Sequence, residues 1–296
     1  MATSVIGFDL GGTKSAVVRY DAITLTPQAS ERTVTSAEKG LEAVLEDVLS
    51  LIEKLRTPDT VAVGLGVPGL ILQPEGRILR TPNIRSSGPV DALALLRARL
   101  NLPVAIENDA HCFTLAEAIA GAGQGSRVCV GITMGTGVGG GIVVDGELLY
   151  GHHGFAGEIG HMLLQPGVPP FKSEDTRGEV EQFLSGTAMG KRCEAAERPE
   201  DYLEGQVCAF MQPQVFREVA WLCTSIVYLL DPSIIVFGGS AGRALKPHLP
   251  VVTEELRRWL LPDTPLPALT IAKRDDAATL GAAILALRAY EKEKST

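Results

Sequence analysis

The chain contains no apolar run that approaches the roughly 20 residues needed to cross a bilayer, and its N-terminus leads directly into a strand-like segment without a signal peptide. It also lacks an excess of positive charge, because 27 Lys and Arg residues stand against 35 Asp and Glu residues, for a formal net charge of −8. A nucleic-acid surface needs clustered Lys and Arg to bind phosphates. These absences predict a cytoplasmic protein that binds neither a membrane nor a nucleic acid.

Cysteine is scarce and widely spaced. There is no C-x-x-C pair and no H-E-x-x-H motif, so neither a disulfide framework nor a metal centre is indicated. The cysteines are expected to be reduced side chains of the core: Cys112, Cys129, Cys193, Cys208 and Cys223. At 296 residues the chain exceeds the usual size of one domain, so we expect two.

The most distinctive stretch that is present runs over residues 131–141 and is rich in glycine. An apolar run over 128–133 stops at a loop that contains Gly135, Thr136 and Gly137, and a second apolar run follows it. Glycine lets a ligand approach the backbone closely, so the loop's N–H groups can face a phosphate. A glycine-rich hairpin without a ligand is the alternative interpretation.

The same stretch matches the spacing G-x-G-x-x-G through Gly135, Gly137 and Gly140. The dinucleotide fingerprint requires a helix directly after the glycines. Here two β-prone runs follow, joined by Asp145-Gly146, which is a hairpin signal. The pattern therefore argues against an NAD-binding Rossmann domain.

A second strand, glycine turn and strand opens the chain, and its turn lies between Asp9 and Lys14. It is not a Walker loop, which has a different spacing and a following helix. An acidic residue at a strand end suits a Mg²⁺ ion held partly through water, while the turn's N–H groups and the Thr13 hydroxyl face phosphate. A plain surface turn is the alternative. Two such hairpins indicate a duplicated architecture that holds a nucleotide between its halves.

Strands alternate with helices through the first part of the chain. Apolar spacing predicts a helix over 41–55, and further helices are expected over 90–100 and 110–120. The pattern indicates a largely parallel sheet, whose ligands gather at the carboxyl ends of strands. The residues expected at these ends or on neighbouring loops are Asp9, Gly69, Asn83, Asn108 and Asp109.

Asp109 has two interpretations. It stands where a helix begins, so it is a candidate N-cap, whose loss costs roughly 1 kcal/mol of stability. It is also a candidate general base, whose loss typically costs about 10² to 10⁴ in rate. As a base, an ordinary carboxylate with a pKa near 4 would already be ionised at pH 7.

Glu158 and His161 lie together in a glycine-punctuated segment over 151–161. A metal site and an ordinary loop histidine are both possible, but hydrogen bonding to a polyhydroxylated ligand is the favoured interpretation. Further along, a buried strand ends at Gly238-Gly239, a third glycine turn against which an adenine ring could lie.

Taken together, these segments resemble the ROK family of sugar kinases and repressors, in the actin, hexokinase and Hsp70 superfamily. The resemblance implies an α/β, two-domain actin-like ATPase (ribonuclease H-like) fold with nucleotide and sugar in the inter-domain cleft. It implies an N-terminal domain of residues 1–115 plus 280–296 and a larger domain of residues 116–279. The implied nucleotide contacts are Asp9, Gly11, Gly12, Thr13, Lys14, Gly135, Thr136, Gly137, Gly238 and Gly239.

The resemblance also implies the sugar site. Asp109 would deprotonate the 6-hydroxyl, Glu158 and His161 match the family's E-x-G-H signature, and Glu181 matches the end of its G-C-hydrophobic-E segment. The implied sugar contacts are Gly69, Asn83, Asn108, Asp109, Glu158, His161 and Glu181.

One departure from the family concerns zinc. Many members bind a structural zinc through a cysteine cluster and the E-x-G-H histidine, but here the loop over 163–177 has no cysteine and Glu179 replaces the last one. We therefore predict no zinc, and expect ordinary hydrogen bonds to orient His161. The family's repressors carry an N-terminal helix-turn-helix, whereas here the first strand starts by residue 4, which disfavours that branch.

The resulting expectation is an ATP- and Mg²⁺-dependent kinase acting on the 6-hydroxyl of a hexose or N-acetylhexosamine, with Asp9 as the Mg²⁺ residue. Glucose and N-acetylglucosamine are the favoured substrates, and N-acetylmannosamine and fructose remain open. A non-catalytic sugar sensor and a kinase acting on a carboxylate are the alternatives. Homodimerisation is expected from the resemblance.

Overall fold

The computed structural model describes residues 3–196, 201–204 and 206–295. The chain divides into two compact units, each built around one five-stranded sheet. Unit 1 comprises Met1–Ala116, Leu149–Ala156 and Asp276–Thr296, and unit 2 comprises Glu117–Leu148 and Gly157–Asp275.

The sheet of unit 1 has the order β3-β2-β1-β4-β7. Its strands are β1 (Ser4–Leu10), β2 (Lys14–Asp21), β3 (Pro27–Val34), β4 (Thr60–Val67) and β7 (Val104–Asn108). The first three form an antiparallel meander, while β4 pairs parallel with β1 and with β7. A short hairpin of β5 (Leu70–Leu72) and β6 (Arg77–Arg80) follows β4. The parallel strands end together, because Asp9 pairs with Gly66 and Val67 pairs with Asn108.

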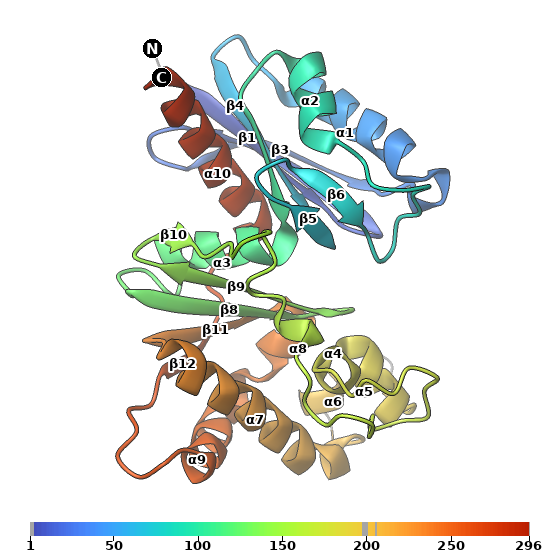
Figure 1. Ribbon diagram of the computed structural model, residues 1–296, viewed down its shortest axis with the longest axis vertical. Helices are drawn as coiled ribbons and strands as arrows, with labels where there is room; N and C mark the ends of the chain where they lie inside the picture. Colours follow the sequence, from blue (N-terminus) through green and yellow to red (C-terminus); the bar gives the residue numbers. More distant parts are fainter. Residues whose placement is uncertain (1–2, 197–200, 205, 296) are drawn as a thin grey trace. The chain divides into compact units, whose positions relative to one another are not determined.

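Helices cover both faces of this sheet (Figure 1). Alternate residues of β1, such as Ile6 and Phe8, pack in one buried cluster with α1 (Leu41–Leu55) and α2 (Ala92–Leu100). The other face carries α10 (Ala277–Lys294), which packs directly on backbone. A Cβ atom on Gly7 or on Gly64 would collide with the main chain of α10. These two neighbouring glycines therefore set how closely the helix approaches the sheet.

The sheet of unit 2 repeats this plan in the order β10-β9-β8-β11-β12. Its strands are β8 (Val128–Met134), β9 (Val138–Val144), β10 (Glu147–Leu148), β11 (Ile234–Gly238) and β12 (Ala268–Ile271). An antiparallel meander again meets two parallel strands, since β11 pairs parallel with β8 and with β12. The duplicated hairpins that the sequence predicts are thus the first strands of two similar sheets.

The core of unit 2 joins this sheet to α7 (Gln212–Leu230) and α9 (Leu249–Trp259), which Figure 1 shows below it. Smaller elements complete the unit: η2 (Ile159–His161), α4 (Glu181–Leu184), α5 (Gly186–Arg192), α6 (Asp201–Glu204), η3 (Ala209–Met211), α8 (Gly239–Ala244) and η4 (Lys246–His248). In unit 1, η1 (Ala37–Lys39) precedes α1, and α3 (Asp109–Ala120) begins directly after β7. No helix within the described ranges has the length and apolarity to cross a membrane.

Two of the five cysteines form a disulfide, which corrects the expectation that all are reduced. Cys193 and Cys208 are joined at an S–S distance of 2.04 Å, while Cys112, Cys129 and Cys223 are buried thiols as expected. The two partners are 15 positions apart, and the chain folds back so that their Cα atoms lie 6.0 Å apart, within disulfide range. Two cysteines so far apart in the sequence give no local sign that they lie side by side in the fold. The sequence pattern alone therefore did not predict this disulfide.

Candidate functional site

The turn between β1 and β2 is fixed from outside by a threonine of the next loop. The hydroxyl of Thr35 donates to the carbonyl of Gly11 at 2.7 Å, and its backbone N–H donates to the carbonyl of Thr13 at 2.9 Å. Gly12 lies against Asn83, because a Cβ atom there would sit 2.6 Å from the Asn83 Cβ. Thr13 and Lys14 remain exposed. The turn thus presents a hydroxyl, an ammonium group and main-chain N–H groups from a rigid frame.

Asp9 and Asp109 provide two carboxyl groups at the ends of β1 and β7. Burial, together with the negative charge of Asp109, raises the pKa of Asp9 to about 7. Burial also raises the pKa of Asp109, although the backbone N–H of Ala110 opposes the rise. The expectation of an ordinary pKa for Asp109 is therefore wrong for the unliganded protein. Two desolvated carboxyl groups that repel each other would gain from a bound cation.

The N-cap of α3 is supplied mainly by Asn108. Its Oδ1 accepts hydrogen bonds from the N–H groups of Ala110 at 2.8 Å and His111 at 3.2 Å. Its Nδ2 donates to the carbonyl of Gly69 at 3.0 Å, which ties β7 to the loop after β4. Oδ1 of Asp109 accepts from the N–H of Ala110, at 2.9 Å. Because a neighbour already caps the helix, the cap does not account for the carboxylate of Asp109.

Glu107 supports this strand end from inside the unit, a role that the sequence reading missed. Its Oε1 accepts from the N–H of Asn108 at 2.8 Å and lies 2.9 Å from His111 Nδ1, while its Oε2 accepts from Gln73 Nε2 at 2.9 Å. Glu107 and His111 are both almost completely buried. Their separation of four residues at a strand-to-helix junction was the only available signal.

In unit 2, Glu181 of α4 braces the loop between β8 and β9. Its Oε2 accepts from the N–H of Val138 at 2.8 Å, and a Cβ atom on Gly137 would lie 2.5 Å from the same oxygen. The carbonyl of Gly135 accepts from Gly186, and the carbonyl of Thr136 accepts from the Thr187 hydroxyl. The loop's carbonyl groups are thus turned inward. A Cβ atom on Gly135 would meet nothing within 4 Å, so this residue borders open space.

The third glycine turn lies beside this loop. Gly238 pairs with Thr133 of β8, and Gly239, which has a φ of 75°, is packed against the carbonyl of Met134. The structure therefore brings together Gly238–Gly239 and Gly135–Gly137 within unit 2, as a joint nucleotide site requires.

Glu158 directly precedes η2 and His161 is its last residue, and this short helix crosses the start of β9. Close approach is possible because Gly160 lies directly on the carbonyl of Val138. His161 is half exposed, and its Nδ1 lies 3.1 Å from Oε2 of Glu179. The predicted residues of unit 2 thus form one group with Glu181. The second group, in unit 1, contains Asp9, Gly69, Asn83, Asn108 and Asp109.

A sequence model of the ROK family matches residues 5–289. The chain belongs to the ROK family. It is similar to the N-acetyl-D-glucosamine kinase of Erwinia tasmaniensis, with 32% identity over 95% of this chain and 99% of the relative. Among solved structures, it resembles a ROK hexokinase from Thermus thermophilus, with 30% identity, a TM-score of 0.83, and coverage of 99% of this chain and 100% of that one.

A further solved relative is a ROK family glucokinase from Streptomyces griseus in complex with glucose and AMPPNP. It is 27% identical to this chain, with a TM-score of 0.73 and coverage of 96% of this chain and 99% of that one. The ROK chain therefore has the two-domain, actin-like ATPase fold, and these three relatives are named as sugar kinases.

The fit to Mg²⁺ rests on Asp9. Within the described part of this ROK chain, no group of three or more His, Cys, Asp or Glu side chains is arranged to hold a metal ion. Mg²⁺ does not require one, because it commonly uses one or two carboxylates with phosphate oxygens and water. The raised pKa of Asp9 shows that its charge lacks compensation, which a cation would supply. Asp9 therefore fits a Mg²⁺ ion that arrives with phosphates.

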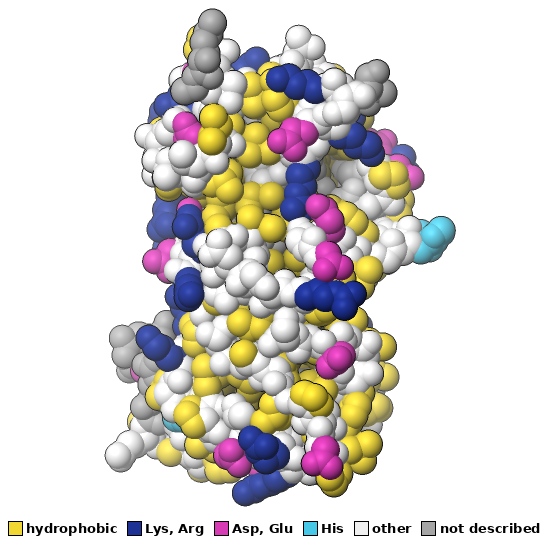
Figure 2. All heavy atoms as spheres, turned by 90° about the vertical axis from the view of Figure 1, so that its left-hand side faces the viewer, with side chains coloured by type: hydrophobic (Ala, Val, Ile, Leu, Met, Phe, Trp, Pro, Cys, Tyr) yellow, Lys and Arg dark blue, Asp and Glu magenta, His cyan; other side chains and the backbone are white. Residues whose placement is uncertain are grey.

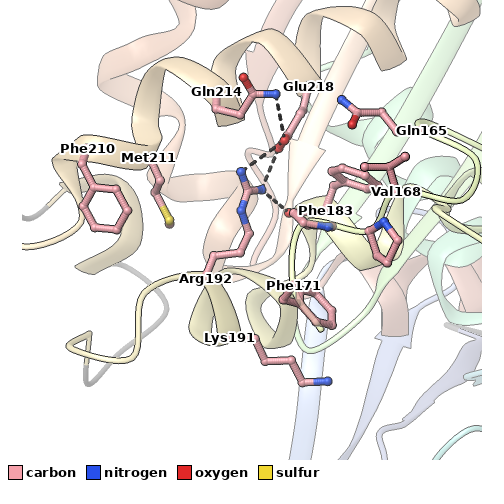
Figure 3. Close-up of a pocket in the computed structure, with 12 residues that line it drawn as sticks. Gln165, Val168, Phe171, Phe183, Lys191, Arg192, Phe210, Met211, Gln214 and Glu218 are labelled. Atoms are coloured by element: carbon pink, nitrogen blue, oxygen red, sulfur yellow. Dashed lines mark hydrogen bonds and ion pairs between the residues drawn. The ribbon is translucent and has the colours of Figure 1, made fainter. Parts of the chain in front are cut away.

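A pocket of about 560 Å³ in unit 2 lies elsewhere (Figure 3). Phe171 and Phe183 line it together with Arg192, which pairs with Glu218 at 2.7 and 3.1 Å and donates to the carbonyl of Phe183 at 3.0 Å. None of the predicted site residues lines it. Volume alone therefore does not mark the functional site of this chain.

Charge on the surface agrees with a small-molecule site. On the face drawn in Figure 2, where the structure describes it, Lys and Arg side chains are interspersed with Asp and Glu rather than gathered into one basic patch. The formal net charge is −8. Neither feature favours a nucleic-acid ligand.

Proposed function

We propose that this ROK chain is an ATP-dependent kinase that phosphorylates the 6-hydroxyl of a hexose or N-acetylhexosamine, with glucose and N-acetylglucosamine as the favoured substrates. The observation that carries the proposal is the pair of desolvated carboxyl groups, Asp9 and Asp109, at the carboxyl ends of β1 and β7, the two strands that flank β4. The names of the relatives support the substrate class.

The geometry supports the proposed roles. Asp109 accepts the proton of the attacking hydroxyl, because its helix is already capped by Asn108 and its carboxylate is left for a ligand. Asp9, partly through water, would hold a Mg²⁺ ion, which would supply charge neutralisation at the transferring phosphate. The turns at Gly11–Lys14 and Gly135–Gly137 offer N–H groups to phosphates, apart from the N–H of Gly135, which donates to the carbonyl of Gly137 at 2.9 Å. Gly238–Gly239 borders the adenine.

Two of the proposed sugar contacts, Glu181 and Asn108, have spare hydrogen-bonding capacity. Glu181 uses one carboxylate oxygen on the N–H of Val138, and the other is left for a hydroxyl. Asn108 retains one N–H of its amide after donating to Gly69. Asn83, Glu158 and His161 complete the set. Phosphoryl transfer depends mainly on positioning and charge stabilisation, so such contacts account for much of the catalysis.

Coupled ADP release tests the proposal. EDTA-washed protein is assayed with and without added Mg²⁺, with ATP and a panel of glucose, N-acetylglucosamine, N-acetylmannosamine, mannose, fructose and acetate. We expect Mg²⁺-dependent turnover with one or two sugars. Asp109→Asn should lower kcat by about 10² to 10⁴, while calorimetry still detects sugar binding. Asp47→Asn, a change of an exposed carboxylate paired with Lys39, is the control.

Two results would contradict the kinase. Sugar binding without turnover in the unsubstituted protein would establish the sensor instead. Turnover with acetate alone would show a carboxylate kinase, for which an Asp base is not needed.

A further inference from the structure

A series of interacting charged side chains, all within unit 2, connects the loop before α4 to His161. Asp175 binds Arg177, with Oδ2 accepting from Nε at 3.0 Å and from Nη2 at 2.6 Å. The same Nη2 lies 3.1 Å from Oε1 of Glu179. Oε2 of Glu179 in turn lies 3.1 Å from Nδ1 of His161. Each carboxylate oxygen of Glu179 thus has its own donor.

The exposed fraction of the side chain differs sharply among these charged residues. The side chain of Glu179 is 6% exposed, whereas those of His161 and Arg177 are 50% and 59% exposed. The carboxylate of Glu179 is therefore a buried charge rather than a surface charge. The exposed part of the imidazole is free to meet a ligand.

The backbone holds Glu179 in place. Leu163 and Glu179 form an antiparallel bridge, and Val180 N–H donates to the carbonyl of Met162 at 2.8 Å. Oε1 of Gln182 accepts from the N–H groups of Gly178 and Glu179. Because the segments carrying His161 and Glu179 are paired by main-chain hydrogen bonds, the distance between the two side chains is fixed by the fold.

The chemistry of this contact determines the histidine tautomer. An ionised carboxylate only accepts hydrogen bonds, so Nδ1 of His161 must carry a proton. In the neutral ring, Nε2 is then an acceptor, since the partner of one ring nitrogen sets the state of the other. A carboxylate partner is a common way to orient a functional imidazole.

We propose that Glu179, supported by Arg177, is a positioning residue that holds His161 in the Nδ1-protonated tautomer so that Nε2 accepts a hydrogen bond from a sugar hydroxyl. This inference rests on the proposed function. It requires that the ligand group facing Nε2 of His161 be a hydrogen-bond donor. A ligand that offers only an acceptor at this position is disfavoured.

Nitrogen-15 NMR of the imidazole rings tests the tautomer without any activity. The signals of His161 are assigned by their loss in His161→Gln. The expected spectrum shows Nδ1 protonated and Nε2 unprotonated in the unsubstituted protein, and a shift toward the Nε2-protonated form in Glu179→Gln, whose amide can donate to Nδ1. An Nε2-protonated ring in the unsubstituted protein would overturn the proposal.

Kinetics test the consequence. Glu179→Ala and Glu179→Gln should raise the KM for sugar by about 10- to 100-fold, with the KM for ATP unchanged and kcat within about threefold. Glu255→Ala is the matched control, because Glu255 is a little-exposed carboxylate of unit 2 that pairs with Arg217 and Arg258. It should leave the KM for sugar unchanged. If Glu179→Ala does not fold, the isosteric Glu179→Gln carries the test.

The outcomes separate this inference from the proposed function. If His161→Gln raises the KM for sugar but neither Glu179 variant does, the positioning role is wrong and the kinase stands. If no sugar is turned over, the proposed function fails, while the NMR spectra still decide the role of Glu179.

Discussion

At the scale of single residues, the functional carboxyl groups of this chain are held in surroundings that oppose their charge. Burial raises the pKa of both Asp9 and Asp109, and their mutual repulsion adds to the rise at Asp9. Such perturbed acids are typical of functional sites. The ordinary pKa expected from the sequence failed because desolvation depends on the folded surroundings, which no local pattern reveals.

The pH dependence of activity should report Asp109. Its pKa lies above the ordinary value of 3.8, and only the ionised form accepts a proton. We therefore expect kcat/KM for the sugar to fall as the pH is lowered through this raised pKa, with an acid limb above pH 4 in a stopped ADP-release assay. An acid limb at the ordinary aspartate value would contradict the prediction.

Stability should change with pH in the opposite direction. An acid whose folded pKa is raised costs nothing below its unfolded pKa, and destabilises the folded state progressively as the pH rises toward the folded value. In Asp109→Asn this cost is absent. Urea unfolding of the unliganded protein should therefore show the variant to be more stable than the unsubstituted protein at pH 8, with the difference shrinking toward pH 4. A variant that is less stable at both pH values would refute the burial argument.

At the scale of elements, the sequence predicted the two glycine-loop hairpins but not the contacts from other elements that brace their loops. Apolar runs broken by glycines identify β1–β2 and β8–β9, because this signal is local. The brace from Glu181 to the β8–β9 loop joins residues 43 positions apart, and strand β3 carries little apolar pattern of its own. Contacts between residues far apart in the sequence depend on the tertiary fold, which the local spacing of apolar residues and glycines does not encode.

Two glycines of the β8–β9 loop should respond differently to alanine. A methyl group on Gly137 would press on the carboxylate of Glu181, whereas one on Gly135 would enter open space. Gly137→Ala should therefore lower the free energy of unfolding by about 1–3 kcal/mol. Gly135→Ala should leave stability nearly unchanged and weaken ATP binding, if its open side receives a phosphate.

Chemical denaturation and calorimetric ATP titration measure the two effects separately. Equal losses of stability in both variants would refute the packing argument. Unchanged ATP binding in Gly135→Ala would instead argue that the open side of the loop does not face the nucleotide.

At the scale of the whole molecule, the fold is one plan used twice, and its sequence signals repeat accordingly. Each sheet joins a three-stranded meander to two parallel strands. The hairpin glycines recur at the same point in both sheets, and this repetition allowed the family resemblance to be recognised from the sequence. The disulfide belongs to neither repeat, and so had no counterpart from which to predict it.

Counting thiols over the whole chain tests this last feature. The native protein should show no rapidly reactive thiol, because Cys112, Cys129 and Cys223 are buried, and burial raises the pKa of Cys129 and of Cys223 to about 12. Titration with a thiol reagent in denaturant should give three thiols per chain without reductant, and five after reduction. In Cys193→Ser the count without reductant should rise to four, because Cys208 is released from its partner. Five thiols in the unreduced, unsubstituted protein would show that the pair is reduced, as the sequence pattern alone suggests.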